Sequence, residues 1–248
     1  MAVTQRVGTR LTKLPVGVLV LKLLAVETST EACSAALHID GETQEKFEIA
    51  PREHTKRILP MIDSLLAEAE LTPQQLDALA FSRGPGSFTG VRISTGIIQG
   101  IAFGADLPVV PVSTLAAIAH YFFSQNSKNN LAFTAMDARM GEIFWGVYRK
   151  NQLGYAELIG EEAVTLAENI IFPKQQGTGI GSGWAVYRPQ LSDCLGNLLI
   201  SVDADHLPRA SAIADLGVIG FKNNQAVEAE NAMPVYLRNK VAKKESER

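Results

Sequence analysis

The stretch SRGPGSFTGVRISTGIIQG, residues 82–100, joins a glycine-dense loop to a segment with the residue pattern of a helix. Such a loop ahead of a helix N-terminus is a common phosphate cradle. A Walker-type loop, however, needs a lysine and a hydroxyl residue after its last glycine, and GPGSFTG at 84–90 is followed by VRI. Its glycines are spaced GxGxxxG, which is one residue longer than the dinucleotide-binding signature. The sequence therefore disfavours a phosphate site at this loop.

The helix after the loop carries Gly96, Gly100 and Gly104, whose four-residue spacing places them on one face. Each glycine costs about 1 kcal/mol relative to alanine inside a helix, so an exposed helix gains nothing from them. Missing side chains let a second helix approach closely, as small residues do between membrane helices. We therefore expect this face, flanked by Phe88 and Arg92, to contact another helix, in this chain or in another subunit.

The composition is that of a globular protein: 248 residues, 46% hydrophobic and 20% charged. A net charge of −3 gives no overall attraction to nucleic acid. Cys33 and Cys194 lack disulfide or metal-binding spacing, which favours reduced thiols in a cytoplasmic protein. Residues 1–21 are basic but have no cleavage site, so we expect a disordered N-terminal extension rather than a targeting peptide. The apolar run at 14–26 is too short and too interrupted to cross a bilayer.

Two stretches share the order strand, acidic residue, turn, strand. Residues 22–39 place Glu27 at the start of a hydroxyl-rich turn, and residues 131–150 place Asp137 at the corresponding point. We infer two related domains that arose by duplication, joined by a polar linker at 124–130. Strands and helices alternate along the chain, which predicts an α/β fold with mixed sheets.

The helix expected over 54–70 carries an apolar stripe at helical spacing, and Pro60 predicts a kink or an earlier break. The stripe consists of Ile58, Ile62, Leu65, Leu66 and Ala69. Further elements are expected as strands at 78–82 and 107–113, and as helices at 89–105, 114–125 and 208–224.

Four segments together resemble the TsaB family, the bacterial partner proteins in threonylcarbamoyladenosine biosynthesis on tRNA. They are LLAVETSTEACSAAL, RGPGSFTGVRI, DARMGEIF and PVYLRNKVA, and the resemblance spans residues 22–242. It implies the actin/Hsp70/sugar-kinase type of fold, with two βββαβα-like domains in tandem. The domains are expected at 22–125 and 126–233, with a C-terminal segment and basic tail at 234–248.

The resemblance also implies a role. Members of this family pair, through helices of the first domain, with the catalytic subunit TsaD, and a P-loop ATPase, TsaE, joins them. The complex transfers a threonylcarbamoyl group to the adenosine beside the anticodon in tRNAs that read codons beginning with A. We expect a cytoplasmic, non-catalytic scaffold that forms a homodimer when alone, meets tRNA only through the complex and has no membrane contact. The expected partner-facing residues are His54, Ile58, Phe88, Arg92, Gly96, Gly100 and Gly104.

Catalytic relatives carry a metal-binding HxxxH after the glycine helix and its following strand. The two ligand positions fall here on Thr114 and Ile118. Isoleucine has no donor atom and a lone threonine hydroxyl is a poor transition-metal ligand, so we expect no metal site and no catalytic residue. His120, two positions later, is expected to pack within the helix with its nitrogen satisfied.

In kinase-like relatives the first turn carries an acidic residue and hydroxyls around phosphate and magnesium. The candidate residues for such a degenerate nucleotide site are Glu27, Thr28, Ser29, Thr30 and Asp137. The glycine-rich run at 177–183 is a candidate remnant of the adenosine-contacting loop. We expect ATP or ADP to bind weakly or not at all, and the alternative is a turn whose hydroxyls bond its own backbone.

A second hypothesis is an enzyme of the same fold, metallopeptidase-like or a phosphotransferase. The missing histidine pair opposes the first, and the second requires Glu27 and Asp137 to organise magnesium. The basic tail is expected to be solvated rather than bound to RNA, because Glu245 and Glu247 interrupt it. The sequence leaves open whether the homodimer is physiological and in which order the partners assemble.

Overall fold

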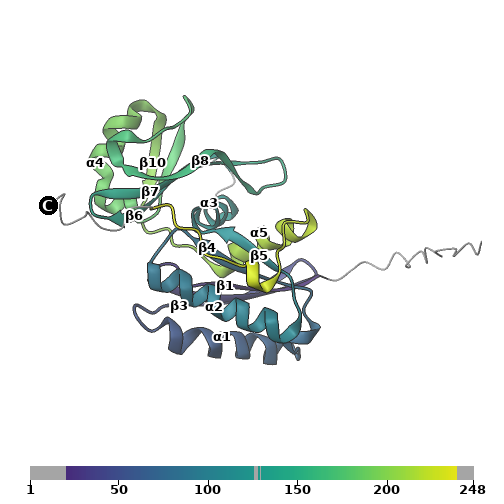
Figure 1. The fold of residues 1–248 in the computed structure, drawn as a ribbon. Helices are drawn as coiled ribbons and strands as arrows, with labels where there is room; N and C mark the ends of the chain where they lie inside the picture. Colours follow the sequence, from purple (N-terminus) through teal and green to yellow (C-terminus); the bar gives the residue numbers. More distant parts are fainter. Residues whose placement is uncertain (1–20, 126–127, 129, 239–248) are drawn as a thin grey trace, which may run out of the picture.

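The computed structural model describes residues 21–125, 128 and 130–238. Two sheets of five strands each are stacked with helices between and outside them (Figure 1). The first sheet contains β1 (Lys22–Glu27), β2 (Ala32–Ile39), β3 (Glu42–Ile49), β4 (Ala78–Gly84) and β5 (Val109–Ser113). The second contains β6 (Leu131–Arg139), β7 (Glu142–Lys150), β8 (Ala156–Leu166), β9 (Gly177–Ile180) and β10 (Leu199–Asp203).

The two sheets have the same topology. The first has the strand order β3-β2-β1-β4-β5, and the second, read from its opposite edge, has the order β8-β7-β6-β9-β10. In each sheet the first three strands are antiparallel, and the last two run parallel to the first. The repeated strand–acid–turn–strand pattern thus marks equivalent hairpins, β1–β2 and β6–β7.

Five α-helices of the described residues cover the sheets. They are α1 (His54–Glu68), α2 (Phe88–Ala105), α3 (Thr114–Gln125), α4 (Gly183–Leu195) and α5 (Ala210–Lys222). Short 3-10 turns are η1 (Pro73–Gln75), η2 (Ala167–Asn169), η3 (Gly196–Leu198) and η4 (Ala229–Asn231). Among the described residues, no helix is long and apolar enough to cross a membrane.

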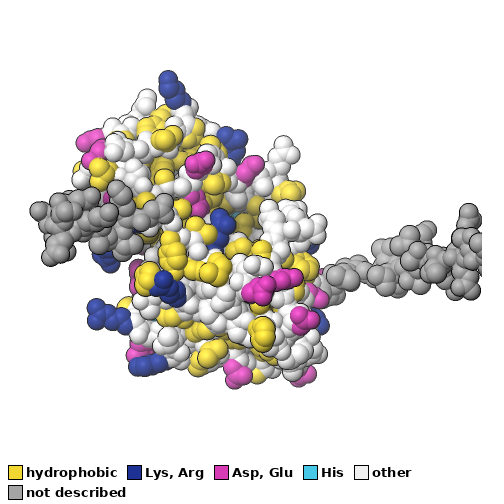
Figure 2. Space-filling model, in the orientation of Figure 1, with side chains coloured by type: hydrophobic (Ala, Val, Ile, Leu, Met, Phe, Trp, Pro, Cys, Tyr) yellow, Lys and Arg dark blue, Asp and Glu magenta, His cyan; other side chains and the backbone are white. Residues whose placement is uncertain are grey.

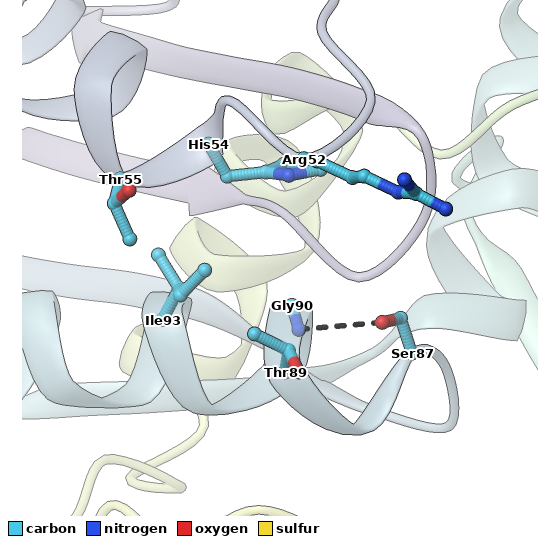
Figure 3. Close-up of a pocket in the computed structure, with 7 residues that line it drawn as sticks. All are labelled: Arg52, His54, Thr55, Ser87, Thr89, Gly90 and Ile93. Carbon is cyan, nitrogen blue, oxygen red and sulfur yellow. Dashed lines mark hydrogen bonds between the residues drawn. The ribbon is translucent and has the colours of Figure 1, made fainter.

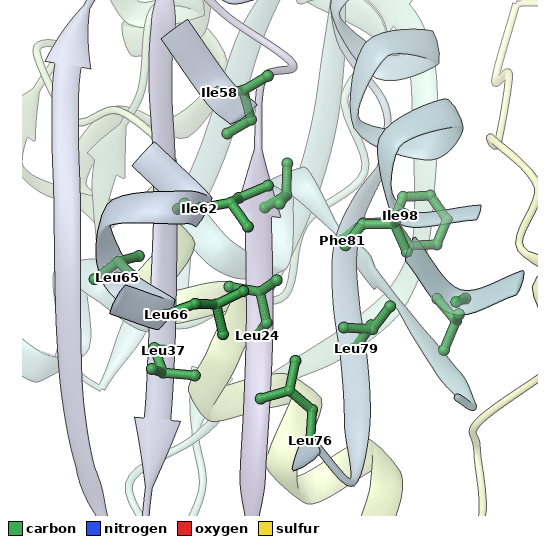
Figure 4. Close-up of a cluster of buried hydrophobic side chains, with 14 of the residues drawn as sticks. Leu24, Leu37, Ile58, Ile62, Leu65, Leu66, Leu76, Leu79, Phe81 and Ile98 are labelled. Atoms are coloured by element: carbon green, nitrogen blue, oxygen red, sulfur yellow. The ribbon is translucent and has the colours of Figure 1, made fainter. Parts of the chain in front are cut away.

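The main core lies between the first sheet and the helices α1 and α2 (Figure 4). The predicted stripe of α1 supplies its side of this core: Ile58, Ile62, Leu65 and Leu66 are buried there, with Ala69 packed beside them. The helix runs unbroken through Pro60, so the break considered from the sequence does not occur. Burial of this stripe, rather than intrinsic propensity, holds the helix in place.

Helices α3 and α5 are exchanged between the two sheets. α3 follows the first sheet in the chain but packs mainly on β6, β7 and β8, whereas α5 follows the second sheet but packs on β1, β2 and β4. The two helices also pack against each other. The layers are therefore α1 and α2, first sheet, α5 and α3, second sheet, and α4 (Figure 1).

This exchange corrects the expected domain boundary at residue 233. α5 and the chain after it belong spatially to the first sheet, where Val227 bridges to Val109 and η4 packs on α2. Glycine permits the close approach of α5, because a Cβ at Gly217 would lie 2.7 Å from the Cβ of Ala80. The expected extension at 1–21 lies outside the described residues except for Leu21, which is buried, and the tail beyond residue 238 also lies outside them.

Candidate functional site

The turn after β1, expected as a degenerate nucleotide site, is closed by its own residues. Glu27, Thr28 and Ser29 are fully buried. The backbone N–H and the hydroxyl of Ser29 both donate to Glu27 Oε1, each at 2.5 Å. Burial raises the pKa of Glu27 to about 7, although the hydrogen bonds from Ser29 partly offset this. Thr30 is half-buried, and its hydroxyl accepts from the backbone N–H of Ala32 at 3.2 Å.

The glycine loop lies directly on this turn. The N–H of Ser87 donates to the carbonyl of Ser29 at 2.7 Å, and the Thr28 hydroxyl donates to the carbonyl of Gly90 at 2.7 Å. A Cβ at Gly86 would lie 2.6 Å from the Ser29 carbonyl oxygen, and one at Gly90 only 2.0 Å from that of Thr28. These glycines therefore allow two backbone segments to touch. As placed here, Glu27, Thr28 and Ser29 present no surface to a nucleotide.

The equivalent turn of the second domain is also occupied by protein groups. Asp137 Oδ1 accepts from the N–H of Arg139 at 2.8 Å, and Asp137 Oδ2 lies 3.0 Å from the Arg139 guanidinium. The hydroxyl of Tyr187 donates to Asp137 Oδ1 at 3.4 Å. The glycine run at 177–183 packs on the second sheet, where a Cβ at Gly179 would lie 2.4 Å from the indole of Trp184. These glycines make room for a tryptophan ring.

The positions aligned with the metal ligands of catalytic relatives lie inside α3. Thr114 and Ile118 are buried, and the Thr114 hydroxyl donates to Ser29 Oγ at 3.2 Å. His120 is buried with Nε2 3.3 Å from Asp215 Oδ2, whereas its Nδ1 has no partner among the described residues. The expectation of a satisfied histidine therefore holds for one ring nitrogen only. Residues 21–125, 128 and 130–238 contain no group of three or more His, Cys, Asp or Glu that could hold a metal ion.

The expected partner-facing residues divide into an exposed and a buried set. Ile58 is 0% exposed in the core, and His54 is buried with Nε2 3.1 Å from the carbonyl of Ala32. Ile58 therefore offers no surface to a partner in this conformation, whereas His54 still lines the pocket between α1 and α2 described below. The exposed set consists of Phe88, Arg92, Gly96, Gly100 and Gly104 on α2.

The glycine ridge of α2 faces open space. A Cβ added at Gly96, Gly100 or Gly104 would meet no atom within 4 Å. Phe103, beside the ridge, is 87% exposed. No helix of the described chain therefore fills the place that the spacing of these glycines predicts.

Two concave regions flank this surface. A pocket of about 330 Å³ lies between the first turns of α1 and α2, lined by Arg52, His54, Thr55, Ser87, Thr89, Gly90 and Ile93 (Figure 3). A groove of about 920 Å³ runs along the C-terminal half of α2, where the 226–230 segment forms its opposite wall. Gly100 and Phe103 lie at its edge. One hollow therefore lies near each end of α2, the first against α1 and the second against residues 226–230.

A hydrogen-bonded contact between the two domains was not predicted from the sequence. Glu162 on β8 accepts hydrogen bonds from Ser113, at the end of β5, and from the hydroxyl of Tyr148 on β7. Burial, followed by the charge of Glu162, raises the pKa of Tyr148 well above its ordinary value. The partners are far apart in the chain and no motif links them, so only the fold brings them together.

Comparisons with known proteins agree with this architecture. The family model for TsaD, tRNA N6-adenosine threonylcarbamoyltransferase, matches residues 46–245. The tRNA threonylcarbamoyladenosine biosynthesis protein TsaB of Escherichia coli (strain K12) is 41% identical over 226 residues, covering 90% of this chain and 96% of that protein. The TsaB protein of Haemophilus influenzae is 42% identical over 231 residues, covering 89% of this chain and 95% of that protein.

Solved structures give the same result. YeaZ from Pseudomonas aeruginosa superposes with a TM-score of 0.81 at 41% identity, covering 88% of this chain and 100% of that one. A second Pseudomonas aeruginosa structure, described as similar to peptidase YEAZ, has a TM-score of 0.82 at 40% identity and the same coverage. The strand–acid–turn–strand repeat, the SFTGVR loop and these relatives lead to one assignment. This chain belongs to the TsaB family of tRNA threonylcarbamoyladenosine biosynthesis proteins.

Proposed function

We propose that this chain is a non-catalytic scaffold subunit in threonylcarbamoyl transfer to the adenosine beside the tRNA anticodon. In this proposal it acts in the cytoplasm, pairs with a TsaD-type catalytic subunit, is joined by a TsaE-type ATPase and self-associates when alone. The names of the relatives support the pathway. The match to the TsaD family model supports a partner of related fold, because related chains can present similar helical surfaces to one another.

The observation that carries the pairing is the exposed ridge of α2. Three glycines with open space beside them, next to a phenylalanine that is 87% exposed, form an apolar surface that the chain itself leaves uncovered. Such a surface on a soluble protein marks an interaction site. Each glycine costs about 1 kcal/mol of helix stability, which a close helix–helix contact would offset.

The interior of the chain supports the non-catalytic part of the proposal. Thr114 and Ile118 replace the paired histidines expected in catalytic relatives, and both are buried. The glycine loop fills the space over Thr28 and Ser29. Scaffold action would then consist of preferential binding to one conformation of the catalytic subunit, because only a difference in affinity between two states can shift their populations.

Reconstitution with purified components tests this function. The TsaD-type and TsaE-type proteins of the same organism, supplied with ATP, tRNA and threonylcarbamoyl adenylate as the donor, would be assayed for tRNA modification with and without this chain, alongside a pull-down of the pair. We expect modification only when this chain is present. Isothermal titration with Mg-ATP tests the alternative function independently. Tight binding and turnover of ATP by the isolated chain would favour a phosphotransferase and contradict the scaffold function.

A further inference from the structure

Three side chains from separate segments meet on the surface beside the first turn of α2. The guanidinium of Arg92 lies 3.3 Å from the centre of the Phe88 ring and 5.4 Å from that of Tyr236. The two rings lie 5.9 Å apart. Phe88 is 60% exposed and Tyr236 44%, so the cluster is open to solvent. Two rings around a guanidinium fix its position while leaving its N–H fork available.

Arg92 is unlike Arg139 and Arg238 in having no ion-pair partner among the described residues. It shares this property with Arg52, in the pocket beside Ser87 and Gly90, and with Arg83. Arg139 is paired with Asp137 at 3.0 Å, and Arg238 is paired with Glu142. None of the ion pairs among residues 21–125, 128 and 130–238 includes Arg92. The cluster therefore presents one uncompensated cation in an aromatic frame. Figure 2 shows, on the face that it draws, Lys or Arg side chains lying singly among hydrophobic ones.

The C-terminal segment 232–238 holds Tyr236 in the cluster. The side chain of Gln99 on α2 donates to the carbonyl of Ala232 at 3.1 Å, and the N–H of Val235 donates to the carbonyl of Arg83 at 2.7 Å. Beyond Tyr236, Arg238 donates to the carbonyl of Arg139 at 3.2 Å and to Glu142. The segment is thus fixed to the first domain before Tyr236 and to the second domain after it.

We propose that Phe88, Arg92 and Tyr236 form a preformed site for a carboxylate side chain of the protein partner. The inference rests on the proposed function, because the partner is then the TsaD-type subunit. Arginine and tyrosine in an apolar surround are the residue types that dominate protein interfaces. A guanidinium fork binds a carboxylate through two parallel charge-assisted hydrogen bonds. An RNA surface would expose a row of cations. Of the three described arginines without an ion pair beside the glycine loop, Arg83 is half-buried, and Arg92 is the one held between aromatic rings, which is the setting of a protein interface.

The test measures the affinity of the purified TsaD-type subunit for the full chain and its variants by biolayer interferometry at low and physiological salt. Arg92→Gln keeps a polar side chain but loses the charge, and we expect it to weaken binding about tenfold or more. Arg92→Lys keeps the charge but loses the forked pair of N–H donors, so its affinity should lie between those of the wild type and Arg92→Gln. Tyr236→Ala should also weaken binding, whereas Tyr236→Phe should not. Arg188→Ala, at an exposed arginine of α4, is the matched control, and thermal denaturation of every variant verifies folding.

The outcomes separate the two proposals. If the wild-type chain binds the TsaD-type subunit and Arg92→Gln binds equally well, the carboxylate site is wrong and the pairing stands. If the wild-type chain does not bind, the pairing is wrong and the site falls with it. If Arg92→Gln leaves subunit binding unchanged but reduces tRNA retention by the assembled complex, the cluster contacts RNA phosphate instead, which also overturns the proposal.

Discussion

Replacing Gly100 by leucine should change stability and partner binding in opposite directions. The thermal stability of the chain should rise, and its affinity for a partner should fall. A Cβ at Gly100 meets nothing within 4 Å, and the residue lies in the interior of α2. In the monomer the substitution removes a glycine from an exposed helix, which should stabilise the protein by about 0.8 kcal/mol. For a chain of this size the melting temperature should rise by roughly 2 °C to 3 °C.

In the assembly the same leucine enters a contact that the glycine keeps close. Overpacking of a tight contact costs about 1–3 kcal/mol. That cost corresponds to a roughly 5- to 150-fold weaker association. The variant should therefore be more stable and yet bind less well, a combination that partial unfolding cannot produce.

Thermal denaturation, sedimentation velocity of the chain alone and interferometry against the TsaD-type subunit would be run on one preparation. Ala185→Leu, at an exposed position of α4 on the second sheet, is the control for an added leucine. A variant with a raised melting temperature and wild-type association in both binding assays would show that the ridge stays in solvent in the assembly. At a concentration where the wild-type chain is monomeric, a lowered melting temperature would contradict the open space beside Gly100.

The remaining predictions concern the fold and the buried acid. Gly90 and Gly96 lie on the same helix but differ in their surroundings. A Cβ at Gly90 would lie 2.0 Å from the Thr28 carbonyl oxygen, so Gly90→Ala should lower the melting temperature. A Cβ at Gly96 would meet no atom within 4 Å, so Gly96→Ala should raise it. Ile58→Ala should cost about 2–5 kcal/mol in urea unfolding, because the side chain is fully buried, whereas Leu59→Ala, at a side chain that is 53% exposed, should cost less than about 0.5 kcal/mol. The pKa of Glu27 is raised from 4.5 to about 7, so the folded state holds its proton more tightly and stability should fall as pH rises through that window, by about 3 kcal/mol. Urea unfolding of Glu27→Gln from pH 4.5 to 8 should show a flatter profile than the wild type, and parallel profiles would rule out this assignment.

The fold could be predicted from local patterns wherever one face of an element is buried. The stripe of α1 and the buried strand β1 carry strong periodic or continuous apolar signals, and the structure confirms both. β3, with the sequence ETQEKFEI, escaped because it is a largely polar edge strand. The exchange of α3 and α5 also could not be predicted, because both helices are apolar and the sequence does not say which sheet each one covers.

The glycines near the start of α2 also show how far sequence spacing can predict contacts. Spacing alone identified Gly96, Gly100 and Gly104 as one face of a helix, and that placement is correct. It could not show that Gly86 and Gly90, only a few residues away, make room for Ser29 and Thr28 of the same chain. A glycine that admits the protein's own backbone and a glycine that leaves a surface open are identical in the sequence. They differ only in what lies opposite, which is a property of contacts between residues distant in the chain.

The closed interior and the open surface have a common physical consequence. The turn at Thr28 and Ser29 is bonded to the glycine loop, Glu162 bonds Ser113 across the domains, and the segment 232–238 joins α2 to the β6–β7 turn. The bonds at Gly90 and Gln99 hold α2, which carries the exposed ridge, and the Glu162 bond holds the end of β5 against the second domain. A scaffold that favours one conformation of its partner gains from such rigidity, because ordering completed in the free chain need not be repeated on binding. On this argument, loosening the segment 232–238 should weaken association even when every residue of the α2 surface is intact.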